Sequence, residues 1–111
     1  HAIGGRHDLA LHHGTLNAVL MPVVLEHNRP HCPALFARLE KALELPAGTN
    51  FIAVVRSLNA DLNIPRGLGA MGVTEVMIPA LAEAAVRDVN TLTNPVRPDA
   101  AVYERLLRAA M

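Results

Sequence analysis

Apolar residues recur at three- and four-residue spacing in one segment of this chain after another, which places them on one face of a helix. In residues 15–26 these positions are Leu16, Val19, Leu20, Val23 and Val24. No segment shows the alternation of apolar and polar residues that is typical of a half-buried strand. The 111 residues therefore predict a single all-α domain spanning 1–111, a compact bundle of five or six helices.

Prolines, glycines and capping residues divide the chain into these helices. We expect helices at 15–26 with a bend at Pro22, from Pro33 to about 45, at 51–62 capped by Thr49 or Asn50, from Thr74 to Val89 with a distortion at Pro79, and from Asp99 to the end. The predicted buried stripe of the third helix is Phe51, Ile52, Val55, Leu58 and Leu62. The glycine-rich stretch 66–73 is expected to be a loop with one short helical turn.

Composition excludes several function classes. Ten basic residues balance ten acidic ones, and aromatic residues make up only 3%, which argues against binding to nucleic acid or to an anionic membrane surface. The uncharged apolar run 18–25 is far shorter than the roughly 20 residues that a membrane-spanning helix needs. A single cysteine, Cys32, fits a reducing compartment, and no signal peptide is recognisable, so we expect a cytoplasmic protein. Residue 1 is not Met, which favours a trimmed chain or a fragment.

Four of the six histidines, His1, His7, His12 and His13, lie in the first thirteen residues. Imidazole is the commonest biological ligand of first-row metals, so this cluster suggests a metal site. On a helix His12 and His13 would point about 100° apart and would not share one ion. His13, directly before Gly14 and the apolar helix, is the better candidate, whereas solvated terminal histidines are the simpler reading of the cluster as a whole.

Two other features carry a weaker signal. His27 and His31 are four residues apart, which is metal-ligand spacing on a continuous helix, but Pro30 is expected to break that helix and leave two surface histidines. Cys32 has no second cysteine or placed base and is interpreted as a small buried apolar residue. The glycines near Met71 do not follow a strand, so no phosphate loop is predicted there.

The run HGTLNAVLMP at 13–22 resembles the iron-containing alcohol dehydrogenases, which have a His-Gly, Ala and Pro pattern of this kind. The likeness continues at 58–65 (LNADLNIP), at 71–73 (MGV), at 79–85 (PALAEAA) and at 93–95 (TNP). It covers nearly the whole chain. The resemblance implies the carboxy-terminal helical domain of a two-domain enzyme whose amino-terminal α/β domain binds the nicotinamide cofactor.

In that family one Asp and three His hold a divalent ion, Fe²⁺ or Zn²⁺. The resemblance maps the third of these histidines onto His13, and it maps His1 either onto the preceding ligand or onto a histidine that relays protons near the nicotinamide. The interval from His1 to His13 differs by about two residues from that in the family, and His12 replaces its usual Pro. The implied reaction is hydride transfer between an alcohol or aldehyde and NAD(P). The helical domain by itself is expected to be inactive.

Two alternatives remain open from the sequence. One is a free-standing helical module without catalysis, which associates with itself as a homodimer, or with a partner protein, through an exposed apolar face. The other is a relative of the maleylacetate reductases, which share the architecture. The general alcohol dehydrogenase pattern is preferred because of Gly14 and the turn at 93–95.

Overall fold

The computed structural model describes residues 2–5 and 11–111, and within these ranges the chain is helical with no strand. The α-helices are α1 (His13–Asn28), α2 (Pro33–Ala42), α3 (Phe51–Asp61), α4 (Ile78–Arg87) and α5 (Ala100–Ala109). Short 3-10 helices join them: η1 (Arg29–His31), η2 (Gly69–Met71), η3 (Glu75–Met77) and η4 (Val89–Thr93). The predicted all-α class with five or six helices is confirmed.

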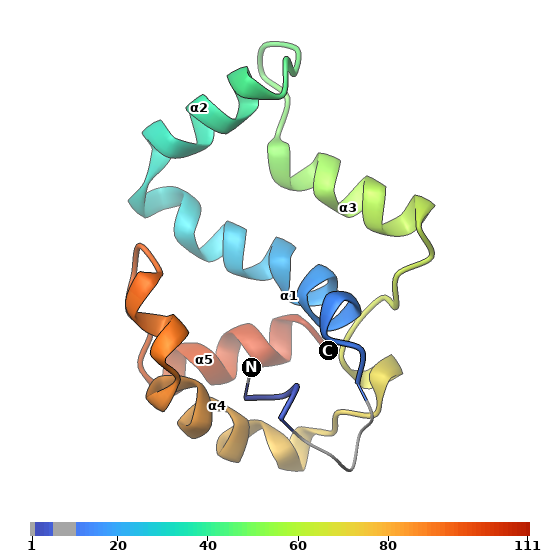
Figure 1. Ribbon diagram of the computed structural model, residues 1–111, viewed down its shortest axis with the longest axis vertical. Coiled ribbons are helices and arrows are strands. Elements are labelled where there is room, and N and C mark those ends of the chain that lie inside the picture. Colours follow the sequence, from blue (N-terminus) through green and yellow to red (C-terminus); the bar gives the residue numbers. More distant parts are fainter. Residues whose placement is uncertain (1, 6–10) are drawn as a thin grey trace.

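The helices form two parts on either side of α1 (Figure 1). The antiparallel pair α4 and α5 packs against one side of α1, and the hairpin of α2 and α3 lies on the other. The radius of gyration is 14.5 Å, against roughly 13 Å expected for a compact domain of this length. The hairpin therefore projects from the main body.

The main hydrophobic core lies between α1, α4 and α5 and the segment that leads from α3 to α4. Four of its side chains are 0% exposed: Leu16, Leu68, Ile78 and Ala82. The other buried core residues come from the same elements and, in the case of Ile3, from the N-terminal segment: Ile3, Val19, Val23, Val73, Leu81, Leu107 and Ala110. Apolar burial of this kind contributes about 25 cal/mol per Å² and is the dominant stabilising contribution.

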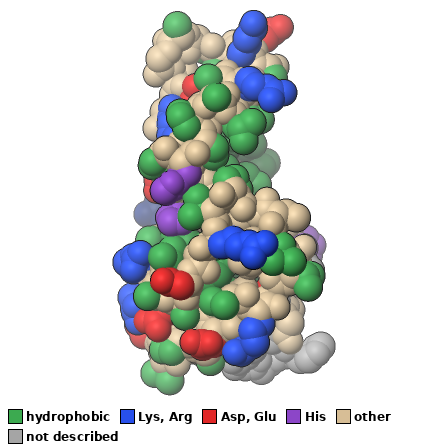
Figure 2. All heavy atoms as spheres, turned by 90° about the vertical axis from the view of Figure 1, so that its left-hand side faces the viewer, with side chains coloured by type: hydrophobic (Ala, Val, Ile, Leu, Met, Phe, Trp, Pro, Cys, Tyr) green, Lys and Arg blue, Asp and Glu red, His purple; other side chains and the backbone are tan. Residues whose placement is uncertain are grey.

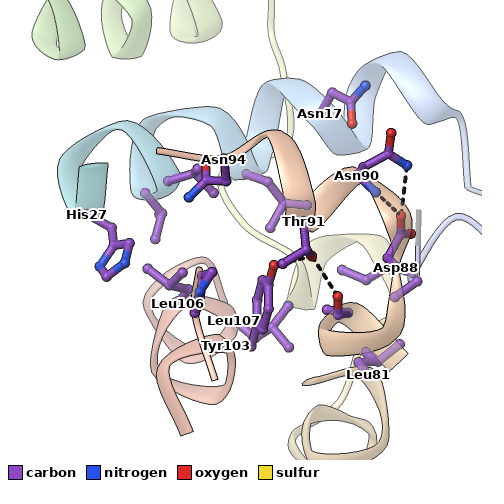
Figure 3. A pocket seen from close by; sticks show the side chains of 17 residues that line it. Asn17, His27, Leu81, Asp88, Asn90, Thr91, Asn94, Tyr103, Leu106 and Leu107 are labelled. Atoms are coloured by element: carbon purple, nitrogen blue, oxygen red, sulfur yellow. Dashed lines mark hydrogen bonds between the residues drawn. The ribbon is translucent and has the colours of Figure 1, made fainter. Parts of the chain in front are cut away.

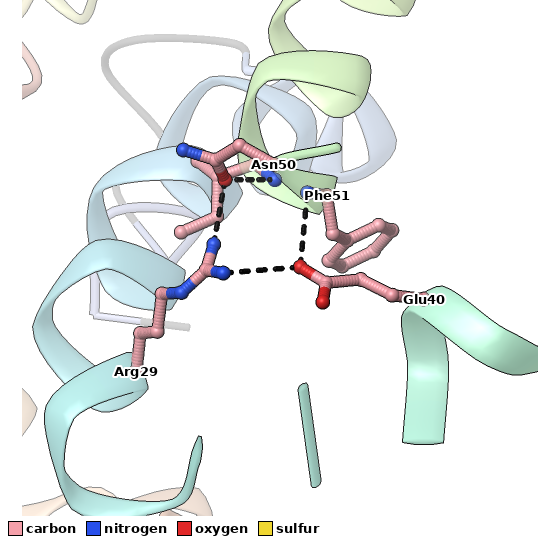
Figure 4. A network of polar contacts seen from close by, with 5 residues as sticks. Arg29, Glu40, Asn50 and Phe51 are labelled. Carbon is pink, nitrogen blue, oxygen red and sulfur yellow. Dashed lines mark hydrogen bonds and ion pairs between the residues drawn. The ribbon is translucent and has the colours of Figure 1, made fainter. Parts of the chain in front are cut away.

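The hairpin is attached to α1 by a polar network (Figure 4). The Arg29 guanidinium donates to Glu40 Oε1 at 3.1 Å and to Asn50 Oδ1 at 2.7 Å, and Glu40 Oε1 also accepts from the Phe51 backbone N–H at 3.3 Å. Asn50 additionally caps α3 by accepting from the Ile52 N–H. The Arg29 side chain, directly after α1, thus orients the start of α3 and the last turn of α2.

Three sequence expectations differ from the structure. The fourth helix begins at Ile78 and not at Thr74, so Pro79 lies in its first turn, where its missing N–H costs nothing, and causes no distortion. The predicted stripe of α3 is only partly buried: Ile52 is 2% exposed, whereas Leu58 and Leu62 are 54% and 61% exposed. Their face of α3 receives no covering element among the described residues, because α2 and α1 contact α3 elsewhere.

Candidate functional site

Two adjacent histidines, His12 and His13, lie at the N-terminal end of α1. His12 is the N-cap residue, with extended backbone angles, and its Nδ1 accepts from the Thr15 N–H at 3.4 Å. A Cβ on Gly14 would lie 3.2 Å from His12 Cε1, so a residue without a side chain suits this position. His13 is the first residue of α1 and is exposed. His12 thus has a structural role that the sequence interpretation missed, since histidine is not a common N-cap.

The other candidate ligand cannot be located. His1 and His7 lie outside the described residues. Among the residues that the structure describes, no three His, Cys, Asp or Glu side chains converge on a point where they could hold an ion. The donor type of His13 fits iron or zinc, but a complete protein coordination sphere is not present in 2–5 and 11–111.

A cavity of about 310 Å³ lies between α1, the α4–η4 segment and α5 (Figure 3). Its wall is mostly apolar, with Leu20, Leu81, Leu106 and Leu107 among the side chains that line it. At the end away from His27 the wall is polar: Figure 3 shows Asn17 from α1 together with Asp88 and Asn90 from the start of η4. A mostly apolar cavity with a few polar groups at one end is typical of a small-molecule site.

The polar end of the cavity is held in shape by Asp88. Its carboxylate accepts from the Asn90 backbone N–H at 2.9 Å and from the Asn90 Nδ2 at 2.8 Å. These hydrogen bonds, the backbone one first, lower the pKa of Asp88 below its ordinary value. The wall beside it is fixed by Thr91, whose hydroxyl donates to the Ala85 carbonyl at 2.8 Å and lies 2.6 Å from the Tyr103 hydroxyl.

A reciprocal amide pair lies in the wall where α1 ends. Asn28 Nδ2 donates to Asn94 Oδ1 at 2.8 Å, and Asn94 Nδ2 donates back to Asn28 Oδ1 at 3.0 Å and also to the Val96 carbonyl. Asn28 is 6% exposed, which makes it the one buried polar side chain among the described core residues. The pair joins α1 to the loop before α5 across 66 positions of sequence.

Residues near both candidate histidines in the sequence line the cavity. Ala2 and Ile3, which follow His1, line it, and so does Asn17, which is one helical turn after His13. That turn is about 6 Å of helix axis. The sequence interpretation did not identify Asn17, Asp88 or Asn90, because residues about 70 positions apart carry no local signal that they line one cavity.

The whole chain, residues 1–111, matches the model of the Fe-containing alcohol dehydrogenase family, C-terminal. It is 41% identical over 105 residues to a 4-hydroxybutyrate dehydrogenase of Cupriavidus necator, covering 91% of this chain and 28% of that one. It is also 35% identical over 103 residues to a 1,3-propanediol dehydrogenase of Klebsiella pneumoniae, covering 86% and 26%.

A solved structure is similar over the full chain. The structure of a 1,3-propanediol oxidoreductase superposes with a TM-score of 0.89 at 31% identity, covering 100% of this chain and 31% of that one. The chain thus spans somewhat more than a quarter of the length of the relatives that it matches. None of the helices within the described ranges is long and apolar enough to cross a membrane.

Proposed function

The chain belongs to the iron-containing alcohol dehydrogenase family, of which it is a C-terminal part, and from this membership we propose that it forms the metal-holding helical region of a nicotinamide-dependent alcohol dehydrogenase. The proposed reaction is hydride transfer between a small alcohol or aldehyde and NAD(P). The observation that carries the proposal is the match over all 111 residues, with His13 at the start of the helix that lines the cavity.

His13 is the proposed metal ligand of the described part. It lies at the exposed N-terminal end of α1, one turn from the cavity wall. Its neighbour His12 caps α1, so of these two adjacent histidines we assign the ligand role to His13. An Fe²⁺ or Zn²⁺ ion, when bound, supplies Lewis-acid polarisation of the alcohol or carbonyl oxygen. One or two histidines do not complete a site, so further ligands must come from the rest of a longer protein.

His1 is proposed as a second ligand or as a proton relay beside the reacting atoms. It lies outside the described residues, but Ala2 and Ile3 directly after it line the cavity. We assign the cavity to the alcohol: its apolar wall would exclude water from the substrate's carbon chain, and the exposed Asn17 amide offers hydrogen bonds at the polar end.

The proposal places residues 1–111 within one helical domain of a larger cytoplasmic enzyme. Neither a strand nor a glycine-rich phosphate loop occurs in the described residues, so NAD(P) would bind to another part of that enzyme. We therefore expect the 111-residue chain to be inactive alone. Alcohol oxidation by the purified chain with NAD(P) would contradict this part of the proposal.

The ligand role of His13 is tested by titrating the metal-free chain with Zn²⁺ and, without oxygen, with Fe²⁺ in a calorimeter. We expect His13→Ala to weaken binding at this site at least tenfold. His12→Asn is the matched control, because Asn removes an imidazole and keeps a good helix cap. Equal affinities of the wild type and His13→Ala for both ions would exclude His13 as a ligand.

A second candidate function, self-association as a homodimer, is favoured by one observation. The hairpin exposes Leu35, Leu39 and Leu43 from α2 at 43–52%, together with Leu58 and Leu62 from α3. Apolar area of this kind commonly marks a contact surface. Sedimentation of the chain tests it: a monomer at all concentrations would exclude self-association, and a dimer lost in Leu39→Glu would support it.

A further inference from the structure

The helical path continues from α1 through η1 without a break. Asn28 and Arg29 have right-handed helical backbone angles, φ −77° and ψ −30° for the first and φ −50° and ψ −46° for the second. Pro30 occupies the first turn of η1, where the φ that proline fixes is compatible with the helical backbone. The α-helix ends at Asn28, just before Pro30, as the sequence indicates, but the 3-10 turn η1 continues its path and keeps the His27 and His31 rings near each other. Residues four apart on a continuing helical path face the same side.

The two imidazoles lie together on the surface at the end of α1. Their ring centroids are 5.9 Å apart and the ring planes are inclined at 52°, so the rings are not stacked face to face. Figure 2 shows histidine side chains side by side on this face of the molecule. Two imidazoles bound to one ion through bonds of about 2.0–2.1 Å have ring centroids about 5–6 Å apart. The observed separation matches that arrangement.

His27 brings a second, independent observation. Its Nε2 is buried and has no hydrogen-bond partner, and no other buried side-chain nitrogen or oxygen of the described residues is left in this state. Buried polar atoms are normally paired, so an unpaired one indicates a missing partner. His31 is exposed, so an ion in solution reaches its imidazole, and His27 lines the adjoining cavity.

The neighbouring groups leave the pair available. The Arg29 guanidinium is engaged with Glu40 and Asn50 and lies 5.5 Å from the centre of the Phe36 ring, on the side of the hairpin. The Cys32 thiol donates to the Asn28 carbonyl at 3.2 Å and is directed to the main chain. No third His, Cys, Asp or Glu of the described residues joins the cluster.

From this geometry we propose that His27 and His31 form a two-histidine binding site for one late first-row divalent ion, with water in the remaining positions. Nitrogen sites of this kind bind Cu²⁺ more tightly than Zn²⁺. His27 is fourteen residues after His13 on α1, about 21 Å along the helix axis. The site is therefore separate from the proposed catalytic ligand and does not rest on the proposed function.

The test uses the metal-free 111-residue chain with CuCl₂, in a background that carries both His1→Ala and His13→Ala and so removes the other two candidate ligands. Electron paramagnetic resonance should show a Cu²⁺ centre with two imidazole nitrogens, and calorimetry should give a dissociation constant that rises at least tenfold in His31→Gln. Because His31 is exposed, this variant should keep its circular dichroism spectrum. His27→Gln should have the same effect on binding, whereas His12→Asn should have none.

The outcomes separate the two metal proposals. If His31→Gln binds Cu²⁺ as tightly as its parent, or if only one nitrogen is found, the two-histidine site is wrong whatever the result for His13. If the Cu²⁺ centre persists in this background and disappears in His31→Gln, the site is established even where His13 proves not to bind a metal. A rise in melting temperature with Zn²⁺ that is absent in His31→Gln would support it independently.

Discussion

Removal of Asn94 tests how much the amide pair between α1 and the loop before α5 contributes to stability. In Asn94→Ala the buried Asn28 amide loses its partner at both Nδ2 and Oδ1. Each buried, unsatisfied polar group costs about 1–3 kcal/mol, and the adjoining cavity gives water some access, so we expect a loss of about 3 kcal/mol.

The reverse change should cost less. In Asn28→Ala the remaining Asn94 is half-buried: its Nδ2 keeps the Val96 carbonyl and its Oδ1 can turn to water, so we expect about 1–2 kcal/mol. The double variant should lose little more stability than Asn28→Ala, because it no longer contains the Asn28 amide that Asn94→Ala leaves unpaired. The cycle should therefore give a coupling free energy of about 2 kcal/mol.

Urea denaturation followed by far-ultraviolet circular dichroism measures these free energies of unfolding. Asn17→Ala is the control, since it removes an exposed amide from α1 and should change stability by less than about 0.5 kcal/mol. If Asn94→Ala costs no more than Asn28→Ala, or if the two costs add in the double variant, the pair is not a buried reciprocal contact and the reasoning fails.

Three further changes have defined outcomes. Gly67→Ala would place a Cβ against the backbone of Met111 and should displace the C-terminus, lowering the urea midpoint, whereas Gly69→Ala, whose Cβ would meet Met111 only at ordinary van der Waals distance, should change the midpoint much less. Asp99→Ala removes the side chain that caps α5 and should cost about 0.5–2 kcal/mol, whereas Asp99→Asn should cost much less. The pKa of Asp88 is lowered by its hydrogen bonds from Asn90. The contribution of Asp88 to the stability of the fold is therefore present above pH 3.8 and lost as the pH falls further. Carboxyl titration by NMR should show the lowered pKa, and an ordinary value would contradict the contact.

Local chemistry is enough to predict the elements and most of their ends. Asn50 and Asp99 are capping residues in the structure as expected, because a side chain that accepts from an N–H two or three residues later needs no distant partner. Thr74 is the N-cap residue of η3, as the sequence suggests for the start of a helix, but the α-helix itself begins only at Ile78, since Pro79 is accommodated in a first turn.

Which apolar side chains are buried depends on which helices pack against each other. The spacing of Leu58 and Leu62 correctly indicates an apolar face on α3, but only the packing of α1 and α2 against α3 shows that this face stays exposed. Likewise, His27 and His31 have ligand spacing in the sequence, and the backbone angles at Asn28 and Arg29 were needed to show that the spacing is maintained in space.

By itself the sequence determined the helical class, the helix caps of α3 and α5, the family resemblance and the candidacy of His13, because periodicity, capping and short motifs are local properties of a chain. Only the tertiary structure decided that Asn17 and Asn90 line the same cavity, that Asn28 pairs with Asn94 and that the hairpin leaves its leucines exposed. These are contacts between residues far apart in sequence, and they form only where the packing of α1 against α4 and α5 brings the segments together.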